Sequence, residues 1–310
     1  MRGVKDERGA VAVVVALLMV PLFGFVAISL DVAGMWWEKQ QLRTGADAGA
    51  LAIAQACGRG ACGTPSGTAQ QLAESNHHGS GATGSVVELT SSTVKVRASA
   101  IRNHAFAPVL GVNSTPINAE AAAGWGSPSG GTAVLPLAFS WCEWQQQTGG
   151  AMPSGTTPRT VYLTKTSGTT DCTGPSNNIV PGGFGWLTVN SGTCGTSTSI
   201  GNIIASDPGN SVPSGCSTAD FTNLQNKVVL LPLFDAYAGT GSGATYRLYG
   251  YAAFKITGYH FGGQYTWNGP CNGNDRCIRG YFDRFVDLSQ AFTYSATAPA
   301  LGASIVTLTS

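Results

Sequence analysis

Charged side chains are scarce in this chain: only 11% of its 310 residues are Asp, Glu, Lys or Arg. The 17 basic and 16 acidic residues leave a formal net charge of +1, which provides no long-range attraction to a polyanion. We therefore expect no nucleic-acid partner. The low charge and the 42 glycines instead predict a loop-rich, β-leaning domain whose surface is covered by small polar side chains.

Common catalytic motifs are also missing. The chain has no G-x-S-x-G turn, no G-x-x-x-x-G-K-[ST] loop and no H-E-x-x-H sequence. We expect no catalytic residue, no cofactor, no metal and no enzymatic activity. One alternative stays open, a hydrolase that uses His104 or His260, because triads assemble residues that are distant in sequence. The adjacent His77 and His78, in a Gly/Ser loop, are interpreted as solvated rather than as metal ligands.

Ionisable side chains are absent from residues 9–30, an apolar run of 22 residues. At a rise of about 1.5 Å per residue this run would form a helix of roughly 33 Å, which is long enough to cross a bilayer. A cleaved signal peptide is the alternative, but its apolar region is shorter, about 7 to 15 residues. We expect an uncleaved anchor in the cell membrane.

Basic residues are slightly more frequent before this run than after it. Arg2, Lys5 and Arg8 precede it, whereas only Lys39 and Arg43 lie in the 15 residues that follow. By the positive-inside rule this distribution predicts a cytoplasmic N-terminus and an extracytoplasmic C-terminal domain.

The helix is expected to continue beyond the membrane to about residue 56. Small and apolar residues recur there at a spacing of three and four, which produces a closely packable stripe. Its members include Leu42, Ala46, Gly49 and Ile53. The stripe has two interpretations that the sequence does not separate: it packs against a partner's helix, or it docks on the chain's own globular domain.

All eight cysteines lie on the C-terminal side of the apolar run, which predicts a domain delivered to an oxidising compartment. Zinc is the less favoured interpretation, because a zinc site needs paired C-x2-4-C spacings or nearby histidines, and the closest pairs, Cys57/Cys62 and Cys271/Cys277, have four and five residues between them. The polar turn at residues 272–275 is favoured as a disulfide-closed turn over a Ca²⁺ site. Eight cysteines allow 105 pairings. We expect sequence neighbours to pair: Cys57 with Cys62, Cys142 with Cys172, Cys194 with Cys216, and Cys271 with Cys277.

The N-terminal segment resembles the TadE/TadG-type proteins of the tight adherence (Flp) pilus machinery, and the TadG type in particular. The resemblance rests on the Glu7-Arg8-Gly9-Ala10 start, the apolar span, Asp31-Val32, Gln41-Leu42 and the Ala46-Asp47-Ala48-Gly49-Ala50-Leu51-Ala52 run. It implies a membrane-anchored accessory protein that works with other pilus-assembly proteins or pilin-like helices, and it implies no catalysis. Val14 stands where substrates of prepilin peptidases carry Glu, so processing at Gly9 is not expected.

Composition divides the rest of the chain. We expect three regions: residues 1–56 as the basic tip, transmembrane helix and helical extension, 57–127 as a small α+β unit with its linker, and 128–310 as a β-rich exported domain. The fold class is therefore a membrane-anchored α+β protein with a long N-terminal transmembrane helix, a small α+β pilin-like unit and a disulfide-containing β-rich domain.

Residues 246–261 alternate between apolar or small residues and polar or aromatic ones, which predicts a long strand. One of its faces carries Arg247, Tyr249, Tyr251 and Tyr259, side chains that could stack on sugars. The alternative is an ordinary strand face that is exposed or covered by a partner. The sequence thus favours a non-enzymatic pilus-assembly or surface-attachment protein, with a membrane-anchored hydrolase or a carbohydrate-binding adhesin as alternatives.

Overall fold

The computed structural model describes residues 7–164, 170–240, 243–288 and 291–309. The predicted basic tip, with Arg2, Lys5 and the side chain of Arg8, lies outside the described part. The chain divides into two compact units. Unit 1 comprises residues 1–54, 63–123 and 308–310, and unit 2 comprises residues 55–62 and 124–307.

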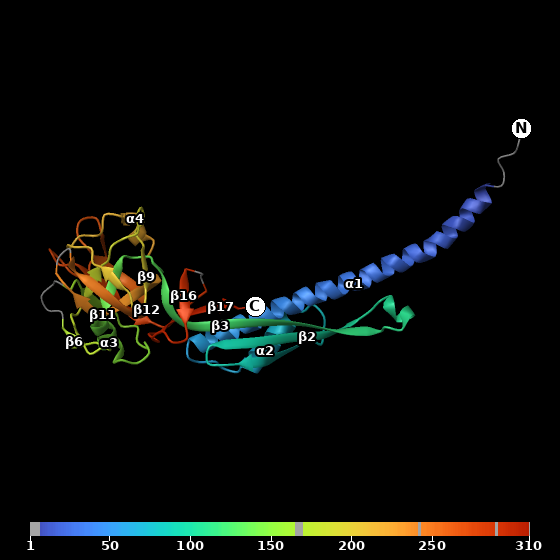
Figure 1. Ribbon diagram of the computed structural model, residues 1–310, viewed down its shortest axis with the longest axis horizontal. Coiled ribbons are helices and arrows are strands. Elements are labelled where there is room, and N and C mark those ends of the chain that lie inside the picture. The colour runs from blue at the N-terminus through green and yellow to red at the C-terminus, as the bar shows by residue number, and fades with distance from the viewer. Residues whose placement is uncertain (1–6, 165–169, 241–242, 289–290, 310) are drawn as a thin grey trace, which may run out of the picture. The chain divides into compact units, whose positions relative to one another are not determined.

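Unit 1 consists of a long helix whose C-terminal half is covered by a short helix and an antiparallel sheet (Figure 1). The strands follow one another in the sheet in the order β1-β2-β3. The elements are α1 (Glu7–Gly58), α2 (Pro65–Ser75), β1 (Thr83–Leu89), β2 (Thr93–Asn103), the 3₁₀ helix η1 (Ala107–Leu110) and the first part of β3 (Ser114–Ala133). The expected helix therefore extends to Gly58, and Gly60, at a φ of 81°, follows it.

The small residues of α1 allow its close approach to α2 and β2. A Cβ added at Gly45 would lie 3.1 Å from the Cα of Ala73 on α2. One added at Gly49 would lie 3.3 Å from Cγ1 of Val96 on β2. Side chains larger than these would hold the elements apart.

This packing decides between the two interpretations of the predicted stripe. Leu42, Ala46 and Ile53 are buried within unit 1, and Gly49 is buried beside them. Of the two interpretations, docking on the chain's own fold describes this face, because Gly49 lies against Ala69 of α2 and Val96 of β2. Period-three spacing alone does not say which surface will cover a helix face.

Unit 2 is built on a sheet with the strand order β5-β14-β12-β11-β4-β8, to which β10 and β13 add by pairing with β12. Its pairs are antiparallel except for β11 with β4. The bounds are β4 (Leu137–Ser140), β5 (Arg159–Tyr162), β8 (Phe184–Trp186), β10 (Ile203–Ala205), β11 (Val228–Ala238), β12 (Thr245–His260), β13 (Thr266–Trp267) and β14 (Cys277–Asp283).

Shorter strands and two helices complete unit 2. The second half of β3 pairs with β9 and β16, β15 runs parallel to β17, and β6 pairs with β7. The remaining bounds are α3 (Trp141–Thr148), β6 (Cys172–Thr173), β7 (Ile179–Val180), β9 (Thr196–Ser199), α4 (Thr218–Thr222), β15 (Phe285–Asp287), β16 (Phe292–Ser295) and β17 (Ala303–Leu308).

Aromatic side chains fill the core of unit 2. The rings of Phe139 and Phe254 lie 4.6 Å apart between centroids, and Phe282 meets both at 5.2–5.4 Å. Large rings bury much apolar area per residue. A long apolar helix followed by a β-rich domain with disulfides is the fold class that the sequence predicts.

Candidate functional site

The N-terminal part of α1, from Val11 to Leu30, is apolar on all sides and largely exposed. Its large apolar side chains between Val11 and Leu30 are 44–74% exposed. Twenty helical residues span about 30 Å, the thickness of the hydrocarbon core of a bilayer. Among the described residues α1 is the one helix long and apolar enough to cross a membrane.

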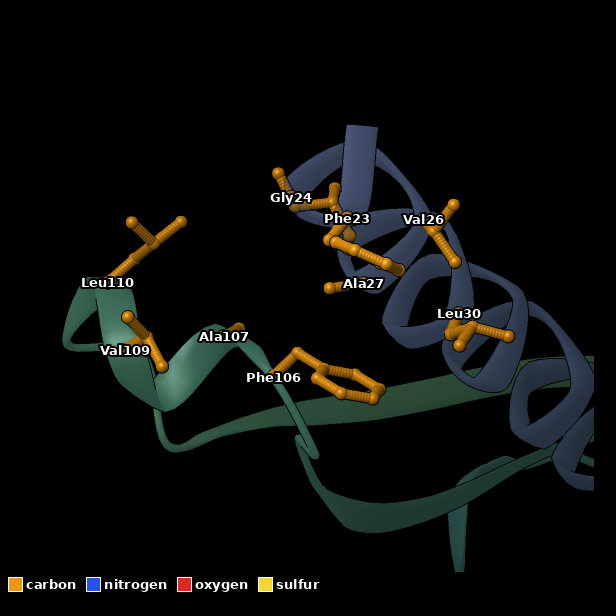
Figure 2. Close-up of a pocket in the computed structure, with 10 residues that line it drawn as sticks. Phe23, Gly24, Val26, Ala27, Leu30, Phe106, Ala107, Val109 and Leu110 are labelled. Atoms are coloured by element: carbon orange, nitrogen blue, oxygen red, sulfur yellow. The ribbon is translucent and has the colours of Figure 1, made fainter. Parts of the chain in front are cut away.

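Asp31 marks the end of this apolar segment and joins α1 to the connection between β2 and β3. Its Oδ1 accepts a hydrogen bond from the backbone N–H of Ala105 at 2.9 Å. Its Oδ2 accepts from the N–H groups of Phe106 at 2.9 Å and Ala107 at 2.7 Å. Figure 2 shows the resulting arrangement, with the connection lying beside α1. One carboxylate therefore fixes the start of η1 against the helix.

A second polar contact lies about two turns further along α1. The buried Glu38 places Oε1 at 3.2 Å from Nε2 of His77 and Oε2 at 3.4 Å from Nη1 of Arg102. The other ring nitrogen of His77, Nδ1, lies 2.9 Å from the carbonyl oxygen of Gly79. Gln41 adds a hydrogen bond from the backbone N–H of His78 at 2.9 Å. These contacts hold the α2–β1 loop and the end of β2 on α1.

The expectation of two solvated histidines is therefore wrong for His77, whose side chain is buried against Glu38. The spacing of 39 residues between the two gives no local signal for this contact. Glu38 and Arg102 were likewise not singled out by motif, and Asp31 was noted only as part of the family resemblance, without its role at the loop. No group of three or more His, Cys, Asp or Glu within the described ranges could hold a metal ion.

The predicted sugar-binding face on β12 is not a continuous exposed surface. Tyr251 is fully buried, and its hydroxyl donates to Oγ1 of Thr198 at 2.7 Å. Burial raises its pKa to about 12. Tyr259 is only 4% exposed and stacks on Phe261. These two side chains enter the core because both faces of β12 are covered.

The other two members of that face are half-buried. Arg247 donates from Nε and Nη2 to the two carboxylate oxygens of the buried Asp235, at 3.0 and 2.8 Å. This bidentate pair compensates the buried charge. Tyr249 makes an edge contact with Trp141, with a centroid distance of 5.2 Å.

The two histidines considered for catalysis have threonine partners. His104 Nε2 lies 2.8 Å from Oγ1 of Thr115 in unit 1. His260 Nδ1 lies 2.9 Å from Oγ1 of Thr266 in unit 2, with Nε2 at 3.4 Å from the carbonyl oxygen of Gly273. In the described chain neither contact has the Ser/Cys–His–carboxylate arrangement of a triad.

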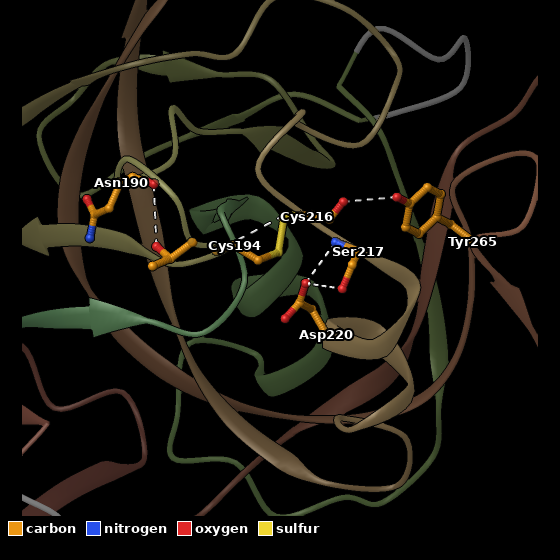
Figure 3. The surroundings of a disulfide bond; sticks show 7 residues. Asn190, Cys194, Cys216, Ser217, Asp220 and Tyr265 are labelled. Carbon is orange, nitrogen blue, oxygen red and sulfur yellow. Dashed lines mark hydrogen bonds between the residues drawn. A yellow bond between two sulfur atoms is a disulfide. The ribbon is translucent and has the colours of Figure 1, made fainter.

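The eight cysteines form four disulfides between sequence neighbours: Cys57–Cys62, Cys142–Cys172, Cys194–Cys216 and Cys271–Cys277. Figure 3 shows the third of these, next to the start of α4. There Asp220 accepts hydrogen bonds from both the N–H and the hydroxyl of Ser217 at 2.7 Å, which lowers the pKa of Asp220. Tyr265 donates to the carbonyl oxygen of Cys216 at 3.0 Å. The pairing of all eight thiols is typical of chains that mature outside reducing compartments.

Within the described residues, an exposed apolar helix of membrane-crossing length followed by a β-rich unit with four disulfides is the pattern typical of membrane-anchored proteins. Residues 9–56, nearly all of α1, match the family model described as putative Flp pilus-assembly TadE/G-like. Over these residues the N-terminal helix is therefore similar to the TadE/G-like pilus-assembly family. No curated protein matches the chain, and no solved structure does.

Proposed function

We propose that this chain is a non-enzymatic, single-pass membrane protein of the TadG type that serves a Tad/Flp-type pilus-assembly or secretion system. The observation that carries the proposal is the coincidence of the family match with the exposed apolar segment of α1. Its partners would be other pilus-assembly proteins, and unit 2 would act in assembly, anchoring or surface attachment.

The proposed orientation places the N-terminus in the cytoplasm and both units outside it. The excess of Lys and Arg before the apolar segment supports this direction. The four disulfides support it too, because such bonds persist in oxidising compartments. A thiol introduced by Ser91→Cys, at the exposed β1–β2 turn, should react with an impermeant maleimide added outside spheroplasts. Labelling only after lysis would contradict the orientation.

Pilus assembly is tested in cells that lack the chain. We expect fewer surface pili, and we expect the full chain to restore them. A matched variant delivers both units through a cleavable signal peptide in place of residues 1–30, so that they are exported without an anchor. This variant should not restore pili if anchoring is required. Normal pili in cells without the chain would contradict the proposed function.

The hydrolase alternative is tested in the same cells through the two histidines. Replacing His104 or His260 with Gln should leave pilus assembly intact if histidine catalysis has no part in it. Loss of pili in either variant, with unchanged thermal unfolding and disulfide content, would favour the enzyme instead.

A further inference from the structure

The connection between β2 and β3 ends in a tip without a polar side chain. Residues 106–112, the apolar loop, read FAPVLGV. Phe106 is 45% exposed, Val109 90% and Leu110 72%. Loop tips are normally polar, since exposing large apolar side chains to water is unfavourable. A contiguous apolar tip of this kind marks an interaction surface.

The apolar loop lies beside the membrane-spanning part of α1. Together they enclose a groove of about 490 Å³, shown in Figure 2. Its lining has no polar side chain: the loop supplies Phe106, Ala107, Val109 and Leu110, and α1 supplies residues between Phe23 and Leu30. Phe23 precedes Asp31 by eight residues, so the groove extends roughly 12 Å along the helix axis from Asp31. That depth is close to the insertion depth of interfacial elements, about 5–10 Å.

The backbone of the apolar loop is prepared for a site with little water. Asp31 accepts the N–H groups of Ala105, Phe106 and Ala107. Within the loop Val109, Gly111 and Val112 donate to carbonyl oxygens of residues 106–108 at 3.0–3.2 Å. Pro108 has no N–H to satisfy. These N–H groups are thus satisfied inside the protein, as a lipid environment requires of backbone donors.

We propose that the apolar loop inserts into the leaflet adjoining unit 1 as a second membrane contact, and that lipid acyl chains fill the groove between it and α1. The occupant is argued from continuity, because the groove is open along the same apolar surface of α1 that crosses the bilayer. Asp31 then lies at the boundary between the membrane and water, where its carboxylate accepts the three backbone N–H groups of residues 105–107. This inference requires that α1 spans a bilayer, and it holds whatever the role of the chain in pilus assembly.

Depth-dependent fluorescence quenching tests the insertion in the full chain. All eight native cysteines are paired, so a single introduced thiol can be labelled with an environment-sensitive fluorophore. The test position is Val109→Cys. Leu17→Cys on α1 reports the anchor, and Ser91→Cys reports the far end of β2. The protein is reconstituted into phosphatidylcholine/phosphatidylglycerol vesicles that contain nitroxide-labelled lipids.

We expect the label at position 109 to be blue-shifted and quenched like that at 17, while the label at 91 stays water-like. The quenching at 109 should not change as protein is diluted into more lipid. Quenching at 17 but not at 109 overturns the loop insertion and leaves the anchor intact. Quenching at 109 that disappears on dilution overturns it as well, because a second copy's helix would then fill the groove. No quenching at either position overturns the anchor too.

Discussion

Oδ2 of Asp31 lies 2.7 Å from the backbone nitrogen of Ala107, across 76 residues of sequence. This hydrogen bond and its two neighbours connect the end of the exposed apolar segment of α1 to the apolar loop. The position of the loop beside α1 therefore depends on one carboxylate rather than on side-chain packing alone.

Asp31→Leu should release the start of the apolar loop, because three backbone N–H groups lose their acceptor. We expect a lower midpoint of thermal unfolding in detergent and faster amide exchange at residues 105–107. The control is Asp47→Leu, 16 residues or about 24 Å further along α1. Protection of residues 105–107 that is equal in the two variants would contradict the role given to Asp31.

Gly49→Leu should separate α1 from its neighbours, because a Cβ there would already lie 3.3 Å from Val96 and 3.6 Å from the Cα of Ala69. Overpacking of this kind costs about 1–3 kcal/mol of unfolding free energy. Gly24→Leu is the matched control, since a Cβ at that position would meet nothing described within 4 Å. Denaturant unfolding followed by circular dichroism measures both, and equal stability in the two variants would refute the packing argument.

Removing Cys142–Cys172 should destabilise unit 2 more than removing Cys271–Cys277, because the two bonds close 30-residue and 6-residue separations. The loop-entropy relation gives a loss of about 3–4 kcal/mol for the first pair and about 2 kcal/mol for the second. Paired Cys→Ser variants and denaturant unfolding measure the difference.

The mass of the intact native chain should rise by eight hydrogens when its four disulfides are reduced. A smaller rise would contradict the four bridges.

Glu143 should make unit 2 more stable as the pH falls. Burial raises its pKa above the ordinary value of 4.5, although the N–H of Gly183 at 2.7 Å and the charge of Arg159 oppose this. The folded state thus binds the proton more tightly than the unfolded chain. Relative to Glu143→Gln, the native chain should gain stability as pH falls from the folded-state pKa to about 4.5. Thermal unfolding of both proteins across this range measures the difference, and a constant difference would contradict the raised pKa.

Glu120 should behave in the opposite way. Lys95 and Arg97 donate hydrogen bonds to its carboxylate from β2, which lowers its pKa below 4.5. Relative to Glu120→Gln, the native chain should therefore lose stability as pH falls from about 4.5 through the folded-state pKa. The same unfolding series measures it, and a gain in stability over that range would contradict the cross-strand contact.

Local patterns predicted the parts of this protein that depend on local physics. The uncharged run at residues 9–30 predicts an exposed apolar helix, and the alternation at residues 246–261 predicts the strand that became β12. The disulfide pairs followed sequence proximity. Periodicity did not reveal that Tyr251 and Tyr259 are buried, because an alternating strand does not state whether its second face is also covered.

By itself the sequence determined the apolar helix of membrane-crossing length, the β-rich class, the disulfide pairs and the TadE/G-like resemblance of the N-terminus, since each depends on residues near one another in the chain. Tertiary structure alone decided that the helical stripe packs on α2 and β2, that Glu38 meets His77, and that Asp31 holds the apolar loop beside α1. These contacts join residues 20 to 76 positions apart, where no short-range preference acts and the arrangement of the whole unit selects the partners.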